Sequence, residues 1–446
     1  MTGKPKFFNG EKILKIILLL GFGVSVAGLI VFYFFKGPPN TSTYTGPRKV
    51  NIEQKNGGYQ FYKDGKPFIV KGGTGVEYIK ELSETGGNTI MCWDTSRLKH
   101  VFEEAKRYNI SVIVGLDIPP YKTGFYNNKH DVAKFFNAYM DIVRRYKDNS
   151  RLLAWCLGNE VSLPFLIDSK PFYRAYNSML DSIHNVDPHH PVSTSIINVS
   201  IKRIAELQWR VPALDFYQLN IYNSLRKIDH LLARIKWMWD GPYLIGEWAP
   251  SGAWEAPVTA WQAPIEYSST RKAELFYELY THYVPVKDPR FLGSLVFYWG
   301  HRQEDTQSWF SIFNKDGTPN EIKEVLNDCW KDTTTVHLSP KFRSLSIDNL
   351  EDKENIILTS GSKHHAALEM QAPGSSDSLR YKWEIYREDW YYARNPPSET
   401  GLFADSTLPV THFSAPQKEG PYRVFITVYN SKGYFATANI PIYVTH

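Results

Sequence analysis

The chain has 446 residues, of which 43% are hydrophobic and 15% aromatic, so it can bury a large core and is too long for one ordinary domain. Its net charge of +5 is small for this length and is spread along the sequence, which argues against a nucleic-acid partner. The chain holds 13 Trp and 28 Tyr, more than a core requires. Because sugar rings pack on exposed aromatic rings, this excess favours a carbohydrate ligand.

The N-terminal segment has the features of a membrane anchor. Residues 16–35 contain no charged residue, and about 20 apolar residues cross a bilayer as a helix. Lysines precede this stretch, so we predict a cytoplasmic basic tail at 1–12, a single transmembrane helix at 13–35, a linker at 36–49 and the rest of the chain outside the cytoplasmic membrane. A cleaved signal peptide is the alternative, but no small-x-small site stands at the boundary.

Residues 50–332 alternate short apolar runs with amphipathic stretches, which is typical of repeated βα units. A hairpin around Asp64 and Gly65 comes first, and a helix is predicted over 131–146 with Asp131 as its cap. Roughly 280 residues in eight units predict an α/β fold, a closed (β/α)₈ TIM barrel. An open doubly wound sheet is the alternative, but no Gly-x-Gly-x-x-Gly motif, typical of that fold, follows the first predicted strand. The predicted strands are 68–73, 88–93, 111–116, 152–157, 190–195, 214–219, 242–246 and 292–298.

Two glutamates follow predicted strands. Glu160 ends the motif Leu157-Gly158-Asn159-Glu160, and Glu247 lies within Leu244-Ile245-Gly246-Glu247-Trp248. Barrel enzymes keep their active sites at the carboxyl ends of the strands, so both side chains should face one site. A pair of carboxylates is the apparatus that cleaves glycosidic bonds. The alternative is that either glutamate caps a helix or pairs with an arginine.

These motifs resemble those of the clan of retaining glycoside hydrolases with (β/α)₈ barrels, clan A, which includes families 2 and 5. Fungal β-1,3-glucanosyltransferases share the same plan. The resemblance rests on short motifs in the correct order along the barrel: Asp64-Gly65-Lys66-Pro67-Phe68, Gly87-Asn88-Thr89-Ile90, Asn159-Glu160, Glu247 and Trp299.

The resemblance implies a role for each matching residue. Glu247 would be the nucleophile and Glu160 the acid, then the base, while Asn159 would hydrogen-bond the sugar 2-hydroxyl. Tyr222 resembles the tyrosine that hydrogen-bonds the nucleophile, and Trp299 resembles the aromatic platform under the cleaved sugar. Each of the last three has an alternative: Asn159 as a turn cap, Tyr222 as scaffold and Trp299 as core.

The sequence departs from this clan at the second strand. Many relatives carry an arginine there that ionises the nucleophile, whereas this chain has Met91. Without that cation Glu247 loses a charge partner that would lower its pKa. Either another donor replaces the arginine, or the chemistry is tuned differently.

Further candidates lie at other strand ends. Trp93, Asp94 and Asp117 stand where βα loops would build a substrate pocket, although solvated loop residues look the same in sequence. Residues 301–305 could hydrogen-bond sugars or form a plain polar loop. No histidine or cysteine spacing suggests a metal site, and we expect no metal and no cofactor.

Residues 333–446 change to short alternating strands with turn residues and no helical period. They predict a small all-β, antiparallel sandwich and resemble the immunoglobulin-like and polycystic-kidney-disease-like modules of bacterial surface glycosidases.

We therefore expect a membrane-anchored retaining β-glycoside hydrolase or transglycosylase whose catalytic domain faces the periplasm or the exterior. The expected partner is a β-linked oligo- or polysaccharide. A β-glucan is preferred because the relatives that the chain resembles act on glucans. The alternative is a catalytically impaired, membrane-tethered protein that binds or assembles glycans.

Overall fold

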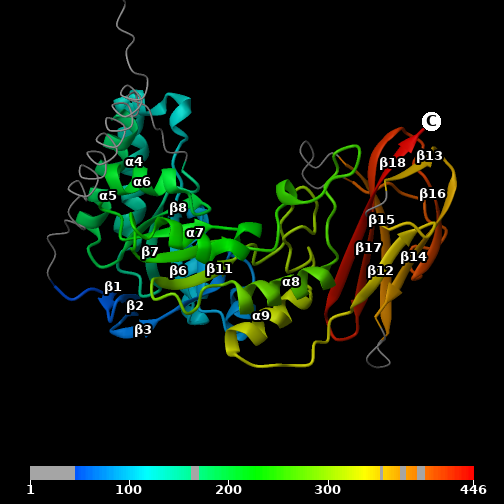
Figure 1. The fold of residues 1–446 in the computed structure, drawn as a ribbon, viewed down its shortest axis with the longest axis horizontal. Helices are drawn as coiled ribbons and strands as arrows, with labels where there is room; N and C mark the ends of the chain where they lie inside the picture. The colour runs from blue at the N-terminus through cyan, green and yellow to red at the C-terminus, as the bar shows by residue number, and fades with distance from the viewer. Residues whose placement is uncertain (1–45, 162–169, 352–354, 372–377, 389–396) are drawn as a thin grey trace, which may run out of the picture.

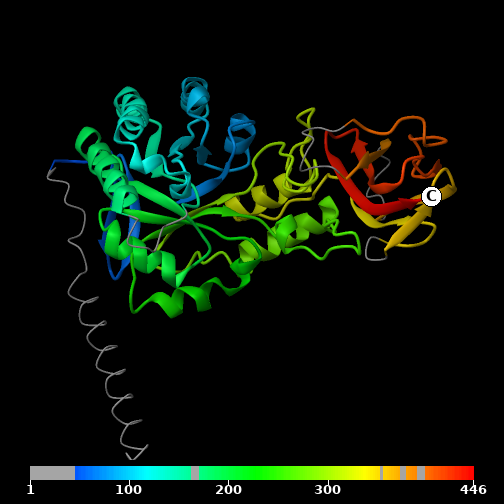
Figure 2. The same cartoon turned by 90° about the horizontal axis from the view of Figure 1, so that it is seen from above.

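The chain forms a barrel and a smaller β-sandwich that lie side by side in a computed structural model (Figures 1 and 2). The structure describes residues 46–161, 170–351, 355–371, 378–388 and 397–446. The predicted tail and transmembrane helix, 1–35, lie outside these residues, as does most of the predicted linker. Within the described ranges, no helix is both long and apolar enough to span a membrane.

The barrel is a complete (β/α)₈ unit, as the sequence predicts. In the described part of the chain, eight parallel strands close in the order β10-β11-β4-β5-β6-β7-β8-β9, and a helix follows each. Most strand residues are buried on both faces, which explains their continuous apolar runs. The strands are β4 (Val70–Thr74), β5 (Thr89–Cys92), β6 (Ser111–Leu116), β7 (Leu152–Leu157), β8 (Val192–Ile197), β9 (Phe216–Asn220), β10 (Tyr243–Trp248) and β11 (Phe291–Val296).

The helices form the outer layer of the barrel. They are α2 (Ile79–Glu84), α3 (Leu98–Arg107), α4 (Lys129–Tyr146), α5 (Lys170–Val186), α6 (Ile201–Arg210), α7 (Ile228–Ile235), α8 (Ser269–His282) and α9 (Glu321–Lys331). The cap predicted for α4 is wrong, because Asn128 precedes Asp131 and its side chain accepts from the backbone N–H of both His130 and Asp131.

A small antiparallel sheet covers the amino-terminal end of the barrel. It comprises β1 (Val50–Lys55), β2 (Gly58–Lys63) and β3 (Lys66–Phe68), joined by the two-residue turns Asn56-Gly57 and Asp64-Gly65 with positive φ at all four residues. Phe61 of β2 is fully buried and lies edge-on to Phe216 at the start of β9, with ring centroids 5.4 Å apart. Ile69 separates this hairpin from β4, so the first barrel strand begins at Val70.

The C-terminal domain is a sandwich of two sheets in the described residues, ordered β12-β14-β16 and β13-β18-β17-β15. One pair differs from the antiparallel prediction: β13 and β18 are parallel, which the long crossover through β14 to β17 allows. The strands are β12 (Phe342–Ile347), β13 (Ile356–Thr359), β14 (Lys363–Met370), β15 (Leu379–Arg387), β16 (Val410–Ser414), β17 (Gly420–Asn430) and β18 (Phe435–Thr445).

The start of helix α8 joins the two domains. Figure 1 shows α8 and α9 on the side of the barrel that faces the sandwich. The hydroxyl of Thr270 accepts from the N–H of Phe342 at 3.0 Å, and the hydroxyl of Ser269 accepts from the N–H of Thr437 at 2.9 Å. The first turn of this barrel helix therefore bonds directly to both sheets of the sandwich.

Candidate active site

A cavity of about 730 Å³ opens at the carboxyl-terminal end of the barrel. Every one of the eight strands, or the loop that follows it, contributes to its wall. The lining residues that the sequence predicts are Glu160, Glu247, Asn159, Tyr222, Trp93, Asp94 and Asp117. The predicted glutamate pair and five of its six predicted companions therefore meet in one pocket.

Glu160 follows β7 on a tight turn. Gly158 has a φ of 85°, and a Cβ there would lie 2.4 Å from Val161 Cγ2, so the turn requires glycine. Glu160 itself has a φ of 47°, in the left-handed region that few non-glycine residues adopt. Asn220 Nδ2 donates to Glu160 Oε1 at 3.1 Å and to Asn159 Oδ1 at 3.4 Å. Asn220, which the sequence analysis missed, thus orients both residues of the Asn-Glu motif.

Glu247 lies within β10, opposite Asn220 of β9. The neighbouring Gly246 makes room for this approach, since a Cβ there would lie 2.9 Å from Asn220 Oδ1. The hydroxyl of Tyr222 donates to Glu247 Oε2 at 2.8 Å. This hydrogen bond confirms the one predicted for Tyr222, and it links the ends of β9 and β10.

The environment of Glu247 favours its neutral form. Only 7% of Glu247 is exposed, and this burial, with a smaller contribution from the charge of Glu160, raises its pKa from the ordinary 4.5 to about 8. The Tyr222 hydrogen bond and the charge of Arg302 act in the opposite direction without outweighing burial. Burial and the Glu247 charge also raise the pKa of Tyr222, so it remains a donor. Met91 also lines the pocket and offers no positive charge that would lower the pKa of Glu247.

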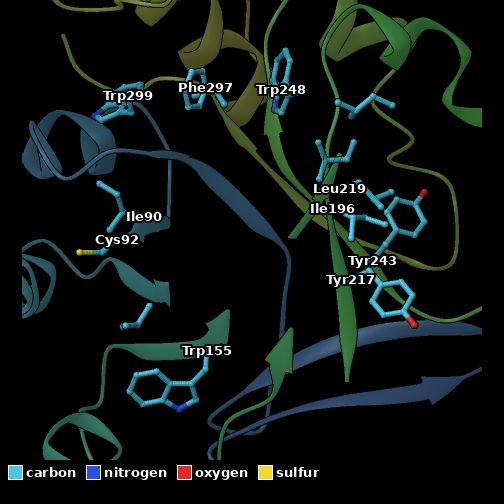
Figure 3. Close-up of a cluster of buried hydrophobic side chains, with 14 of the residues drawn as sticks. Ile90, Cys92, Trp155, Ile196, Tyr217, Leu219, Tyr243, Trp248, Phe297 and Trp299 are labelled. Atoms are coloured by element: carbon cyan, nitrogen blue, oxygen red, sulfur yellow. The ribbon is translucent and has the colours of Figure 1, made fainter. Parts of the chain in front are cut away.

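The prediction for Trp299 is wrong. This side chain is fully buried in a hydrophobic cluster (Figure 3) and does not line the pocket. Its Nε1 donates to the carbonyl of Tyr78 at 3.1 Å. Strand β11 ends at Val296, two residues before the predicted end, and Phe297 and Tyr298 line the pocket instead. The chain then turns back over the end of β4, which places Trp299 in the core.

Trp254 and Glu255 are pocket residues that the sequence analysis missed. They lie in the loop after β10, and Trp254 is 61% exposed with its ring edge-on to Tyr222 at 5.2 Å. Glu255 accepts from the backbone N–H groups of Asn223 and Gly252. Their position a few residues after Glu247, in a loop at the carboxyl end of a predicted strand, is the signal that could have found them.

Two arginines line the pocket, and each has a carboxylate partner. Arg97 pairs with Glu77 at 2.9 Å, and Arg302 Nε donates to Glu304 Oε2 at 2.7 Å. The guanidinium of Arg302 also lies 5.0 Å from the ring centre of Phe297. Arg302 and Glu304 belong to the 301–305 segment, which therefore contributes to the pocket. Within the part of the chain that the structure describes, no group of three or more His, Cys, Asp or Glu could hold a metal ion.

No protein-family model matches the chain, and no curated protein matches it. Among solved structures, a Bacteroides uniformis β-glucuronidase is 13% identical with a TM-score of 0.50, covering 89% of this chain and 48% of that one. An endo-β-1,4-mannanase from Thermotoga petrophila is 13% identical with a TM-score of 0.43, covering 86% and 99%.

The chain thus spans about half the length of that glucuronidase. At this identity the likeness concerns the fold. The chain shares the (β/α)₈ barrel fold of a glycoside hydrolase, as its resemblance to clan A implies.

Proposed function

We propose that the protein is a retaining β-glycoside hydrolase, or the closely related transglycosylase. The observation that carries this proposal is the pair Glu160 and Glu247 at the strand ends of one barrel pocket, each held by its own hydrogen-bond donor, Asn220 or Tyr222. Such a pair, at the end of the barrel where enzymes of this fold work, is the minimum apparatus for glycoside cleavage.

In the first step, Glu247 attacks the anomeric carbon as a carboxylate. A bond forms between its oxygen and that carbon while the glycosidic C–O bond breaks, and Glu160 gives its proton to the leaving oxygen. Asn159 lines the pocket beside Glu160, and in this proposal it hydrogen-bonds the sugar 2-hydroxyl. This contact strengthens in the oxocarbenium-like transition state, so it lowers the barrier.

In the second step, Glu160 acts as the base. It takes a proton from water, or from a sugar hydroxyl in transglycosylation, as that oxygen bonds to the anomeric carbon and Glu247 leaves as a carboxylate. Two displacements restore the original anomeric configuration. Whether the enzyme hydrolyses or transglycosylates therefore depends on whether the acceptor side of the pocket binds water or a sugar.

We infer that the substrate is a neutral β-linked glycan, with a β-glucan as the first candidate. Six Asp and Glu side chains line the pocket beside two arginines, and both arginines are paired with carboxylates. This charge disfavours a uronic acid. Trp93 and the exposed Trp254 offer rings on which a sugar could stack.

The anchor at 13–35 remains part of the proposal, with the barrel on the periplasmic or extracellular side. Its support is the uncharged stretch at 16–35 with lysines before it. Alkaline extraction of membranes tests it: the full chain should stay in the membrane fraction, whereas a chain without residues 1–35 should be released. Release of both would rule out the anchor.

A glycan-binding role is the second candidate. Two observations favour it: Met91 replaces the usual arginine, and Glu247 has a pKa of about 8, so it is largely neutral at neutral pH. A neutral carboxyl group can hydrogen-bond a sugar but is a poor nucleophile.

Product analysis by mass spectrometry tests both candidates. The full chain in detergent is incubated with β-linked gluco-, manno- and xylo-oligosaccharides, beside E247Q and a control, E206Q, at a buried glutamate of α6. Products shorter than the substrate, formed by the wild type and E206Q but not by E247Q, would establish hydrolysis. Products longer than the substrate would establish transglycosylation. Binding that survives in E247Q without turnover in any protein would establish the second candidate.

A further inference from the structure

A buried carboxylate lies where the barrel meets the sandwich, outside the pocket. Glu266, in the loop between β10 and α8, is only 2% exposed. It accepts from the Thr306 hydroxyl at 2.6 Å, the Ser308 hydroxyl at 2.8 Å and the Lys272 ammonium at 2.5 Å. The two hydroxyls belong to the loop after β11, which also carries pocket residues. Glu266 therefore binds this loop on the side away from the pocket.

The sandwich supplies the other side of this cluster. Asn439 of β18 donates to Glu266 Oε2 at 2.8 Å, and its Oδ1 accepts from Arg423 of β17 at 2.7 Å. Arg423 is fully buried and also donates to the carbonyl of Pro264 at 2.7 Å. Burial alone would raise the pKa of Glu266, but the charges of Lys272 and Arg423 hold it below its ordinary value. Glu266 is thus ionised, with partners from both domains.

The held loop leads straight into the pocket. The backbones of Thr306 and Glu304 exchange two hydrogen bonds, at 2.8 and 2.9 Å. Lys272 Nζ also donates to the carbonyl of Ser308 at 2.8 Å. Two residues further on, the ring of Phe310 lies 5.6 Å from that of Tyr222, the residue that donates to Glu247. Displacing Thr306 would therefore move groups that line or support the pocket.

We propose that Glu266 is a positioning residue, through which the C-terminal sandwich fixes the 300–312 loop, with Arg302 and Glu304, against the pocket. The sandwich is then part of the active-site construction and not a passive appendage. The kinetic consequences rest on the proposed glycosidase function; the ordering of the loop does not.

The chemistry of the cluster supports this role. The cluster buries four charged side chains, because Glu388 also pairs with Arg423 at 2.6 Å. Burying them costs desolvation energy that apolar side chains would avoid, so such a cluster is a weak device for stability alone. Its donors and acceptors instead define one geometry, because a loop that shifted would leave buried hydrogen-bonding groups without partners.

The test compares T306V with T306S and with T411V in the full chain. Thr306→Val keeps the side-chain shape but removes the hydroxyl that Glu266 accepts from, whereas Thr306→Ser keeps it. Thr411 is a matched control, a buried threonine on β16 whose hydroxyl contacts neither Glu266 nor the pocket. We measure kcat and KM, the melting temperature, and hydrogen exchange of the amides in 300–312.

We expect T306V to lower kcat/KM by about 10- to 100-fold, the usual effect of a small misplacement near a reacting centre, with T306S and T411V close to wild type. The amides of 300–312 should exchange faster in T306V alone. Unchanged kinetics and exchange in T306V would overturn the proposal, as would an equal fall in T411V. If the wild type shows no turnover but T306V still exchanges faster, the anchoring of the loop would be upheld and the glycosidase function rejected.

Discussion

The two ends of the barrel use the same eight strands in opposite ways. At the amino end, the β1-β2-β3 sheet closes the barrel with apolar groups such as Phe61, and Asp288 bonds both Arg290 and the hydroxyl of Tyr243. At the carboxyl end, Glu160 has a left-handed backbone and Glu247 is buried with a raised pKa. The difference indicates that stability is built at one end and chemical reactivity at the other.

The largest expected effect is at the carboxyl end and depends on the leaving group. Glu160→Ala removes the acid that protonates a poor leaving oxygen, so kcat/KM on an oligosaccharide should fall by about 10²- to 10⁴-fold. On a nitrophenyl β-glycoside, whose leaving group needs no proton, the first step should lose less than about tenfold. Rate measurements on both substrates check this. Equal losses on both would contradict the acid role of Glu160.

A substitution at the amino end should affect stability and leave activity unchanged. Phe61→Ala should lower the free energy of unfolding by about 3–5 kcal/mol, the usual cost of a cavity from a buried phenylalanine. The folded variant should keep its kcat/KM, because Phe61 lies at the end of the barrel away from the pocket. Urea unfolding measures the first effect, with Lys66→Ala on the exposed part of the same hairpin as control. A matching fall in kcat/KM would show that the two ends are coupled.

The stability gained by Glu247→Gln relative to the wild type should increase as pH rises. The folded chain holds the Glu247 proton up to about pH 8, whereas an unfolded glutamate loses it near 4.5, so this group's stabilising contribution is complete below pH 4.5 and disappears as pH rises toward 8. Glutamine cannot ionise. Between pH 5.5 and 7.5 the variant should gain about 1–3 kcal/mol relative to wild type. Urea unfolding at several pH values tests this, and a difference that does not change with pH would contradict the raised pKa.

The smallest effect is expected for Tyr222→Phe. Losing the donor to Glu247 removes a hydrogen bond that favours its ionised form, so the pKa of Glu247 should rise further. We expect kcat/KM to increase with pH through about 8 in the wild type, since the nucleophile must ionise. In Y222F this limb should move to higher pH and kcat/KM at neutral pH should fall by about 10- to 100-fold. A limb that stays in place would remove Tyr222 from the nucleophile's support.

The sequence predicts the features that follow from local pattern. Apolar runs, turn glycines and strand-end glutamates give the eight strands and place Glu160 and Glu247 at one end, because parallel strands in a barrel share their direction. The prediction for Trp299 fails because β11 ends two residues earlier than predicted, and this difference decides whether a side chain after the strand faces the pocket or the core. Asn220 and Glu266 fail for another reason: Glu160 lies 60 residues from Asn220, and Thr306 lies 40 residues from Glu266, so no local spacing records these contacts.

The complete burial of Arg423 has a practical consequence for anyone who wishes to trim or shuffle this protein. Its guanidinium donates to a barrel carbonyl, so a cut at the apparent boundary near residue 332 would leave a charged cluster without its counterparts. A replacement module would have to supply an arginine and an asparagine on neighbouring strands, offset by two residues in register as Arg423 and Asn439 are. The two domains should therefore be kept together in engineering, although their folds look separable.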